Sequence, residues 1–439
     1  MNLFRGRVAV LGFVILVVAA ACGPTAQVLH PTLPPRLSSH PVTTPSDTAN
    51  PNATPGSETP APPATPPPPG ITDPLTSFPS ADAFEVTGVA ATTDGFEAVG
   101  FGDLAGQGYF GLRQGIVWKS ADGLSWQESA DPAFQDVTPT NIVTLGSDVY
   151  VFGMFSTCAS ALDSECVDDP GAGTVVFRSP NGGPWERLTQ TPDIQQAQFD
   201  GVRTAANMLV AFGSAADENG TSTLWTSTDG LAWTATTDLA GLDPVSAVAA
   251  NDAGLVAFGT RYDDTIEDTQ LVAATSSDNI HFTAANVPSI PIASVVDMAA
   301  GPGGFVGVGY AESDVAPSIG LTVASADGTS WAQTVASDGS FQDSLLTDVH
   351  SAANEYVSVG STLDSNDPTL QTGRIWASAD GQRWRSLGDF GGPFSQYGAS
   401  ALGASGLVVF TADQAESEND YDIRSTIYGW FLPTNRLGP

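Results

Sequence analysis

One short pattern occurs seven times between Phe84 and Trp430, and in six copies it ends in a turn of the form Ser-x-Asp-Gly-x-x-Trp or a close variant. The serines of these turns stand at positions 120, 179, 227, 276, 325 and 378, so neighbouring copies lie 48 to 59 residues apart. This period is typical of one four-stranded blade of a β-propeller. The chain is therefore predicted to be all-β, with a seven-bladed β-propeller over residues 75–439.

Each copy contains a strand of alternating character that ends in glycine, or in Thr411 in the last copy. These second strands of the blades are expected at residues 96–100, 149–153, 209–213, 255–259, 305–309, 356–360 and 407–411. Strands with this alternation suit blades that are packed on both faces. The nine tryptophans fall mainly on third and fourth strands, where we expect them to form the core between blades rather than a sugar-binding platform.

The repeated turns have a structural explanation that needs no ligand. Serine and aspartate oxygens accept hydrogen bonds from nearby backbone N–H groups, and glycine adopts a positive φ. We assign this structural role to the third residue of each turn, namely Asp122, Asn181, Asp229, Asp278, Asp327 and Asp380.

The turns resemble the Asp-box, or bacterial neuraminidase repeat, of sialidase-like propellers, whose pattern is Ser-x-Asp-x-Gly-x-Thr-Trp. In this chain the glycine follows the aspartate directly, as in Asp122-Gly123, so each copy is one residue shorter than the family pattern. The resemblance implies a related repeat propeller rather than a sialidase proper. A sialidase site would need three arginines for the substrate carboxylate, a tyrosine and glutamate as the nucleophile pair, and an aspartate as the acid/base, all near the central channel. This set cannot be assembled from the present sequence.

The seventh copy lacks the turn, because residues 426–431 run into Leu432-Pro433 and the end of the sequence. Propellers commonly close their ring with strands from both ends of the chain, which removes exposed strand edges. We therefore expect Leu75 to Phe84 to supply an outer strand to the last blade.

The N-terminal segment has the layout of an export signal. Arg5 and Arg7 precede an apolar run that ends in Ala19-Ala20-Ala21-Cys22, which resembles the lipobox of bacterial lipoproteins. Residues 1–22 are thus interpreted as a lipoprotein-type signal peptide with lipidation at Cys22, the alternative being ordinary secretion. Residues 23–74 are rich in Pro, Thr, Ser and Ala and are predicted to be a disordered tether. The expected location is extracytoplasmic, anchored to the bacterial cell membrane only by the lipid.

Cysteine content and charge agree with an exported domain. The two other cysteines, Cys158 and Cys166, lie in one loop and are expected to form a disulfide there. The net charge is −34, which argues against nucleic acid as a partner because binding it requires a basic face. We expect a monomer.

Polar residues stand out in the first strands of the blades, which should line the propeller axis. Counted back from the end of each second strand, most equivalent positions hold small or apolar residues. The exceptions are the candidate binding residues Asn141, Arg203, Asp297, Asp348 and His350, of which the last four are also candidate catalytic residues. Asp297 and Asp348 fall at equivalent positions of adjacent blades, where one carboxylate raises the pKa of the other. The alternative is that these groups and water satisfy one another.

Acidic loops join the second and third strands. The cluster Asp263, Asp264, Glu267 and Asp268 is the candidate calcium site, although it lacks the spacing of an EF-hand loop and a solvated loop is the alternative. No other cofactor is expected.

Three functions remain open on the sequence. The leading hypothesis is a surface-anchored, non-catalytic propeller that binds a glycan or an envelope protein through the loop face, where insertions and interblade connections gather. The second is a sialidase-like glycoside hydrolase or lyase with a site at the mouth of the channel. The third is a structural or assembly scaffold of the cell envelope.

Overall fold

The computed structural model describes residues 72–79, 83–103, 113–129, 131–156, 173–205, 207–217, 219–263, 268–290, 293–311, 318–336, 339–352, 354–364, 371–394, 396–415 and 424–437. All of them belong to one compact unit, Gly70–Pro439. Lipidation at Cys22, the tether up to residue 71 and the Cys158–Cys166 pair therefore concern residues outside the described ones. In the described part of the chain, no helix has the length and apolar character needed to cross a membrane.

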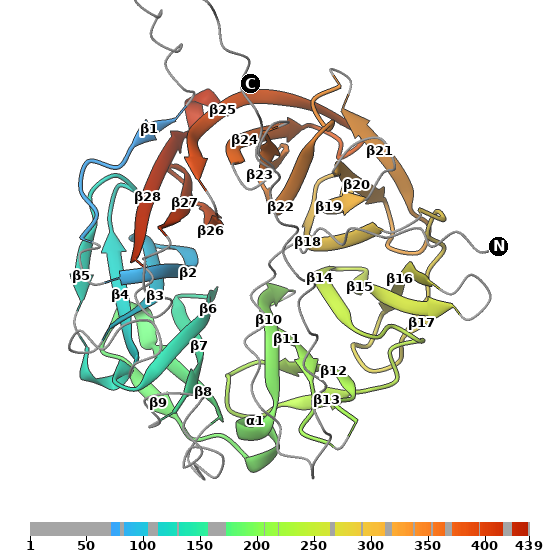
Figure 1. Ribbon diagram of the computed structural model, residues 1–439. Helices are drawn as coiled ribbons and strands as arrows, with labels where there is room; N and C mark the ends of the chain where they lie inside the picture. Colours follow the sequence, from blue (N-terminus) through green and yellow to red (C-terminus); the bar gives the residue numbers. More distant parts are fainter. Residues whose placement is uncertain are drawn as a thin grey trace, which may run out of the picture. The chain divides into compact units, whose positions relative to one another are not determined.

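The described strands form seven antiparallel four-stranded blades around a common axis, as predicted (Figure 1). Blade 1 consists of β2 (Ala83–Thr92), β3 (Gly95–Asp103), β4 (Arg113–Ser120) and β5 (Gln127–Ser129). Blade 2 consists of β6 (Val137–Leu145), β7 (Asp148–Phe155), β8 (Gly173–Ser179) and β9 (Glu186–Leu188). Blade 3 consists of β10 (Gln198–Ala205), β11 (Met208–Ser214), β12 (Ser222–Ser227) and β13 (Thr234–Thr236).

Blades 4 to 7 repeat this order. They are β14 (Val245–Asn251), β15 (Gly254–Asp263), β16 (Asp268–Ser276) and β17 (Thr283–Ala284); β18 (Ala293–Gly301), β19 (Gly304–Ala311), β20 (Ile319–Ser325) and β21 (Ala332–Ala336); β22 (Ser344–Ser351), β23 (Tyr356–Leu363), β24 (Gln371–Ser378) and β25 (Arg383–Phe394); and β26 (Gln396–Leu402), β27 (Gly406–Ala415), β28 (Arg424–Pro433) and β1 (Asp73–Pro74). The described helices are short: η1 (Pro132–Phe134), η3 (Pro180–Gly182), α1 (Pro192–Gln196) and η4 (Thr434–Arg436).

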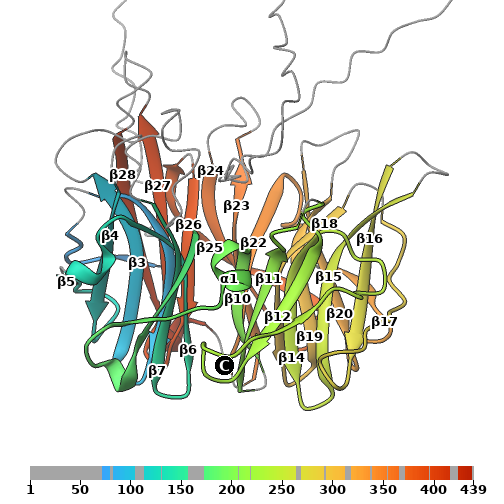
Figure 2. The ribbon, with the colours of Figure 1, turned by 90° about the horizontal axis from the view of Figure 1, so that it is seen from below.

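Two faces follow from this topology. The hairpins between first and second strands and between third and fourth strands lie at one end of every blade, and we call this end the turn face. The connections between second and third strands and between blades lie at the other end, the loop face (Figure 2).

The ring closes with an N-terminal strand, but its residues differ from the predicted ones. Asp73 and Pro74 pair with Phe431 and Trp430, and the N–H of Leu75 donates to Gly429 O at 3.1 Å. The chain then turns toward blade 1, where Thr76 N donates to Leu124 O at 2.8 Å. The prediction that Leu75–Phe84 forms the closing strand was therefore wrong in its bounds. The strand starts two residues earlier, at Asp73, and ends at Pro74, whereas Phe84 belongs to the first strand of blade 1.

The core lies in the seams between blades. In the seam of blades 7 and 1, the Phe78 ring packs 5.0 Å from Trp118 and 4.9 Å from Phe410, measured between ring centroids. Six tryptophans are at most 7% exposed and the other three are partly buried. The prediction that tryptophans form interblade core is thereby confirmed, because none is presented to solvent as a platform.

Candidate functional site

All seven first strands carry a β-bulge at the same place. In every blade the register shifts between the pairs that flank residue 87, 140, 200, 246, 296, 347 or 398, and β2 has a second shift at Phe84. A bulge inserts one unpaired residue and turns the next side chain. Asn141, Asp297 and Asp348 each come directly after the bulge of their strand, so the sequence count aligned equivalent positions correctly.

Hydroxyl groups at the bulges connect neighbouring blades. Thr87 Oγ1 donates to Pro139 O at 2.9 Å, and Ser246 Oγ donates to Val295 O at 2.6 Å. Each bond runs from the bulge of one first strand to the first strand of the next blade. These two bulges therefore connect blade 1 to blade 2 and blade 4 to blade 5 near the axis.

An ion pair crosses one blade near the axis. Arg203 in blade 3 donates from Nε and Nη2 to Asp297 Oδ1 in blade 5, at 3.1 and 3.0 Å. Blade 4 lies between them and contributes Ala247 and Ala249 at the equivalent positions. The two small side chains leave room for the guanidinium to reach past that blade.

A second polar group forms between blades 6 and 7. Asp348 Oδ2 accepts hydrogen bonds from Ser400 Oγ at 2.6 Å and from Tyr397 OH at 3.1 Å. His350 Nε2 lies 2.7 Å from Ser400 Oγ, which places the serine between the histidine and the carboxylate. In a nucleophilic triad the histidine lies between the other two, so this order does not activate the serine.

One backbone amide links the two groups. Val349 N donates to Asp297 Oδ2 at 2.9 Å and lies 3.1 Å from Asp348 Oδ1. On the other side, Asn141 Oδ1 accepts from Val202 N at 3.3 Å, next to Arg203. The structure therefore brings all five sequence-predicted site residues into one continuous network, which we call the axial network.

Burial controls ionisation in the axial network. Asp297 is 3% exposed, and this burial, together with the nearby Asp348 carboxylate, raises the pKa of Asp297 to about 7 although Arg203 opposes the rise. Burial and the Arg203 charge lower the pKa of His350 to about 4, so its imidazole is neutral at pH 7. Burial also raises the pKa of Tyr397, which stays protonated and can donate to Asp348.

The network lies at mid-height of the propeller rather than at a mouth. Asp297 pairs with Val308, four residue pairs from the Gly301–Gly304 end of the β18–β19 hairpin. Arg203 and His350 lie two residues further along their strands, toward the turn face. These residues therefore gather inside the channel and not at its mouth, where the glycoside hydrolase hypothesis expected a site.

Sequence reasoning missed Tyr397 and Ser400. Eleven positions before the end of the second strand, the residue is apolar in blades 1 to 6 and is Ser400 in blade 7. Fourteen positions before that end, the residue is again apolar in blades 1 to 6 and is Tyr397 in blade 7. Extending the count to these positions would have found both polar exceptions.

The turn aspartates have the structural role predicted for them in the turns of blades 1 and 3 to 6. Asp229 Oδ1 accepts from Leu231 N at 2.8 Å and Ala232 N at 2.9 Å, and Ser227 Oγ accepts from Gly230 N at 2.9 Å. These backbone hydrogen bonds lower the pKa of Asp229.

Asn181 in blade 2 is different. Its φ is +51°, and its side-chain oxygen accepts from Ser147 Oγ at 2.7 Å instead of from the turn's own backbone. The sequence prediction of an equivalent turn was wrong in this detail.

Half of the candidate calcium site falls on undescribed residues. Asp264 and Glu267 lie outside the described residues, while Asp263 and Asp268 pair across the β15–β16 ladder and Asp263 Oδ2 accepts from Gln270 Nε2 at 3.0 Å. Among the described residues, no group of three or more His, Cys, Asp or Glu side chains is placed to hold a metal ion.

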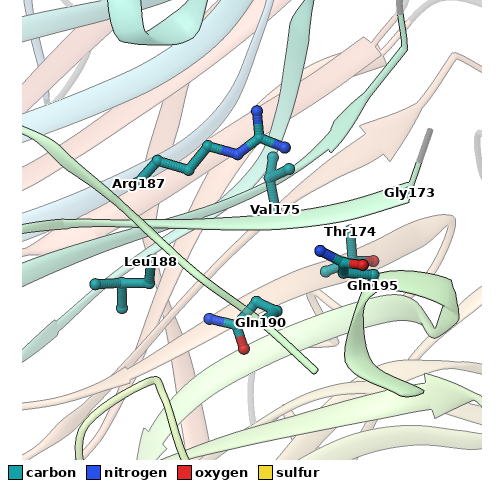
Figure 3. A pocket seen from close by; sticks show the side chains of 7 residues that line it. All are labelled: Gly173, Thr174, Val175, Arg187, Leu188, Gln190 and Gln195. Carbon is teal, nitrogen blue, oxygen red and sulfur yellow. The ribbon is translucent and has the colours of Figure 1, made fainter. Parts of the chain in front are cut away.

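A cavity beside β8 and α1 is too small for an organic ligand. It has a volume of about 20 Å³ and is lined by Thr174, Arg187, Gln190 and Gln195 among others (Figure 3). Gln190 Nε2 already donates to Gly230 O at 2.9 Å. A cavity of this size holds about one water molecule.

Comparison with known proteins gives only distant structural similarity. No protein-family model matches the chain, and no curated protein matches its sequence. Among solved structures, the phage phi92 endosialidase is 11% identical with a TM-score of 0.43, and the match covers 83% of this chain and 69% of the endosialidase.

Two other solved structures are similarly distant. A Trypanosoma rangeli sialidase is 13% identical with a TM-score of 0.42, covering 81% of this chain and 54% of the sialidase, so the chain spans about half the length of that protein. The propeller domain of the trilobed protease from Pyrococcus furiosus is 8% identical with a TM-score of 0.46, covering 81% and 94%. TM-scores below 0.5 are too low to transfer an activity, a substrate or catalytic residues to this chain.

Proposed function

We propose that this seven-bladed propeller is a non-catalytic binding module. It is held outside the cytoplasm by a lipid on Cys22 and binds a glycan or an envelope protein through its loop face. The tether over residues 23–74 keeps the propeller away from the membrane surface. A net charge of −34 permits a cationic partner and disfavours nucleic acid.

One observation carries the non-catalytic part of this proposal: the carboxylate oxygens of the axial network are already engaged. Both oxygens of Asp297 accept hydrogen bonds, one from Arg203 and one from the Val349 amide. Oδ2 of Asp348 accepts from Tyr397 and Ser400. A general acid, base or nucleophile must instead reach a substrate atom. These groups stabilise the axis and connect blades.

Recognition is therefore expected on the loops. Variable connections on a rigid scaffold commonly carry binding, and the connections between second and third strands vary widely in length, from four residues between β15 and β16 to 17 between β7 and β8. A ligand that binds only the folded state raises the melting temperature.

The test is a melting-temperature screen of the protein against envelope and host glycans, with calcium and with chelator as separate arms. A saturable rise with one glycan, retained in Asp348→Asn, supports recognition away from the axis. If no glycan raises the melting temperature, capture of a defined partner from envelope extract supports the envelope-protein form of the proposal. A shift with calcium alone that is lost with chelator points to the acidic loop around Asp263.

A glycoside hydrolase or lyase is the second candidate, favoured by one specific observation. The raised pKa of Asp297, about 7, would leave about half of this carboxyl group protonated at pH 7, next to the Asp348 side chain. Such a pair is the usual requirement for glycoside cleavage. Turnover of chromogenic glycosides that disappears in Asp348→Asn and Asp297→Asn would replace the binding-module proposal. If the protein is instead an envelope scaffold, glycans leave the melting temperature unchanged and its loss disturbs assembly of the envelope.

A further inference from the structure

The seam between blades 1 and 2 differs from other seams at one buried position. The residue three before the end of each second strand is Tyr150, Val210, Val256, Val306, Val357 or Val408 in blades 2 to 7, and each is at most 2% exposed. In blade 1 this residue is Glu97, which is 5% exposed. A carboxylate therefore occupies a position that is apolar or aromatic in every other blade.

In several seams this side chain covers the turn glycine of the following blade. A Cβ placed on Gly328 would lie 2.6 Å from Val256, one on Gly381 would lie 2.4 Å from Val306, and one on Gly230 would lie 2.7 Å from Tyr150. The turn glycine of blade 2 is Gly182, and among the described residues no atom lies within 4 Å of a Cβ placed there. The side chain that closes those seams is thus missing between blades 1 and 2.

The uncovered space is a pocket on the turn face. It has a volume of about 420 Å³, within the range of small-molecule sites. Its walls come from Thr92 and Asp94 in the β2–β3 hairpin, from Asp122 in the Ser-x-Asp-Gly turn of blade 1, and from Ser147 and Gly182 of blade 2. The irregular turn of blade 2, in which Asn181 binds Ser147, shapes the far wall.

Glu97 is the polar group at the base of this pocket. Its Oε1 lies 2.8 Å from Nζ of Lys119, the only lysine in the chain. Its Oε2 is buried and has no hydrogen-bond partner among the described residues. A buried carboxylate oxygen without a donor is costly to a folded protein, and a ligand donor placed there would remove that cost.

We propose that this pocket binds an organic cation, namely a primary ammonium or guanidinium group that donates to the Glu97 carboxylate. Charge favours a cation, because Asp94, Glu97 and Asp122 line the pocket against the single ammonium of Lys119. Geometry favours an organic group over a metal ion, because the described residues contain no cluster of three metal-ligating side chains. The hydroxyl groups of Thr92 and Ser147 in the walls can accept or donate further hydrogen bonds.

This inference is independent of the loop-face proposal, because the pocket lies at the opposite end of the blades. The cation can come from a small free amine or from a lysine or arginine side chain of a partner protein. Both sources present the same group to Glu97, and the pocket volume accommodates either.

The test is calorimetric titration of the protein with n-butylammonium, n-butylguanidinium and the neutral isostere n-butanol. We expect saturable binding of a cation, no binding of n-butanol, and at least tenfold weaker binding to Glu97→Gln. The matched control is Asp389→Asn, which removes a carboxylate that pairs with Arg374 in blade 6 and should leave binding unchanged. Equal binding of n-butanol, or equal binding by all three proteins, would overturn the proposal.

A second measurement needs no variant. Because Lys119 is the only lysine, selective ¹³C labelling of lysine gives a single side-chain Cε signal. Titration with n-butylammonium should shift that signal saturably, and a signal that does not move contradicts binding at Glu97. Blocked lysine and arginine amides then identify the source: binding of these compounds indicates a partner side chain, and binding of the free amines alone indicates a small amine.

Discussion

Asp297 at the axis and Glu97 in the seam of blades 1 and 2 are two carboxylates buried to nearly the same extent, at 3% and 5% exposure. Asp297 has both oxygens engaged, by Arg203 and by the Val349 amide. Glu97 has one oxygen on Lys119 and one without a partner among the described residues. Burial of a polar group is therefore a weak guide to function, and the unfilled hydrogen-bonding capacity is the more informative property.

The surroundings explain the difference. Asp297 gathers partners from blades 3 and 6 because all first strands converge on the axis (Figure 1). Glu97 lies in the seam between blades 1 and 2, where the turn glycine of blade 2, Gly182, is not covered by a neighbouring side chain among the described residues. Variants at both sites, and at two of the turns, test this difference.

The largest effect is expected for Arg203→Met. At pH 8.5 Asp297 is ionised and the variant should lower the free energy of unfolding by about 3 kcal/mol, because the buried charge loses its partner. At pH 5.5 Asp297 is protonated, since its pKa is about 7, and the loss should be much smaller. Urea denaturation at both pH values measures the difference. Arg374→Met, which breaks a more exposed pair, serves as control with a loss of less than about 1 kcal/mol at either pH. An equal loss at both pH values for Arg203→Met would contradict the raised pKa.

The next effect is an opposed pH dependence in two variants. Asp297 has a raised pKa of about 7, so its contribution to stability is greatest below pH 4 and is lost as the pH rises to 7. His350 has a lowered pKa of about 4, so its contribution is present above pH 6.5 and is lost as the pH falls to 4. The two contributions oppose each other in the native protein.

As the pH rises from 4.5 to 6.5, the free energy of unfolding of Asp297→Asn should increase relative to that of the native protein. Over the same rise in pH, the free energy of unfolding of His350→Gln should decrease relative to that of the native protein. Each change should reach about 2 kcal/mol, from shifts of two to three pKa units. Denaturant midpoints across this pH range provide the measurement. Parallel curves for both variants and the native protein would show that these groups do not titrate as described.

A smaller effect separates two turns. Asp229→Ala removes an acceptor for two backbone amides and should lower the free energy of unfolding by about 1 to 2 kcal/mol. Asn181→Gly removes an exposed bond to Ser147, while glycine tolerates the φ of +51° at this position, and should cost less than about 0.5 kcal/mol. Thermal melts of both variants compare the turns directly. Equal losses would mean that the irregular turn of blade 2 is as strongly held as the regular ones.

The smallest effect is expected for Glu97→Val, which gives blade 1 the residue found in blades 3 to 7. It removes a buried oxygen that has no donor, while Lys119 is 37% exposed and can remain hydrated. We expect the free energy of unfolding to rise by about 0.5 to 1 kcal/mol. A loss of stability instead would show that the ion pair with Lys119 stabilises the fold by more than the unpaired oxygen destabilises it. Glu97 would then be a stabilising buried carboxylate, as Asp297 is.

The sequence by itself determined the blade number and the register. Hydrogen bonding and alternation within each copy act over a few tens of residues, and such local patterns can be recognised in the sequence. The period of 48 to 59 residues and the strand-ending glycines therefore identified equivalent positions in all seven blades. Ring closure could not be placed to the residue, because the strand at Asp73–Pro74 pairs with residues more than 350 positions away and carries no local signature.

Only the tertiary structure decided which polar residues meet. Arg203 and Asp297 are 94 residues apart and come together because the first strands converge on one axis and Ala247 and Ala249 are small enough to let the guanidinium pass. The pocket at Glu97 depends likewise on the conformation of a turn in the next blade, where Gly182 leaves space that a side chain fills in other seams. Local interactions set the blades, whereas the contacts between blades depend on how all seven pack into a closed ring.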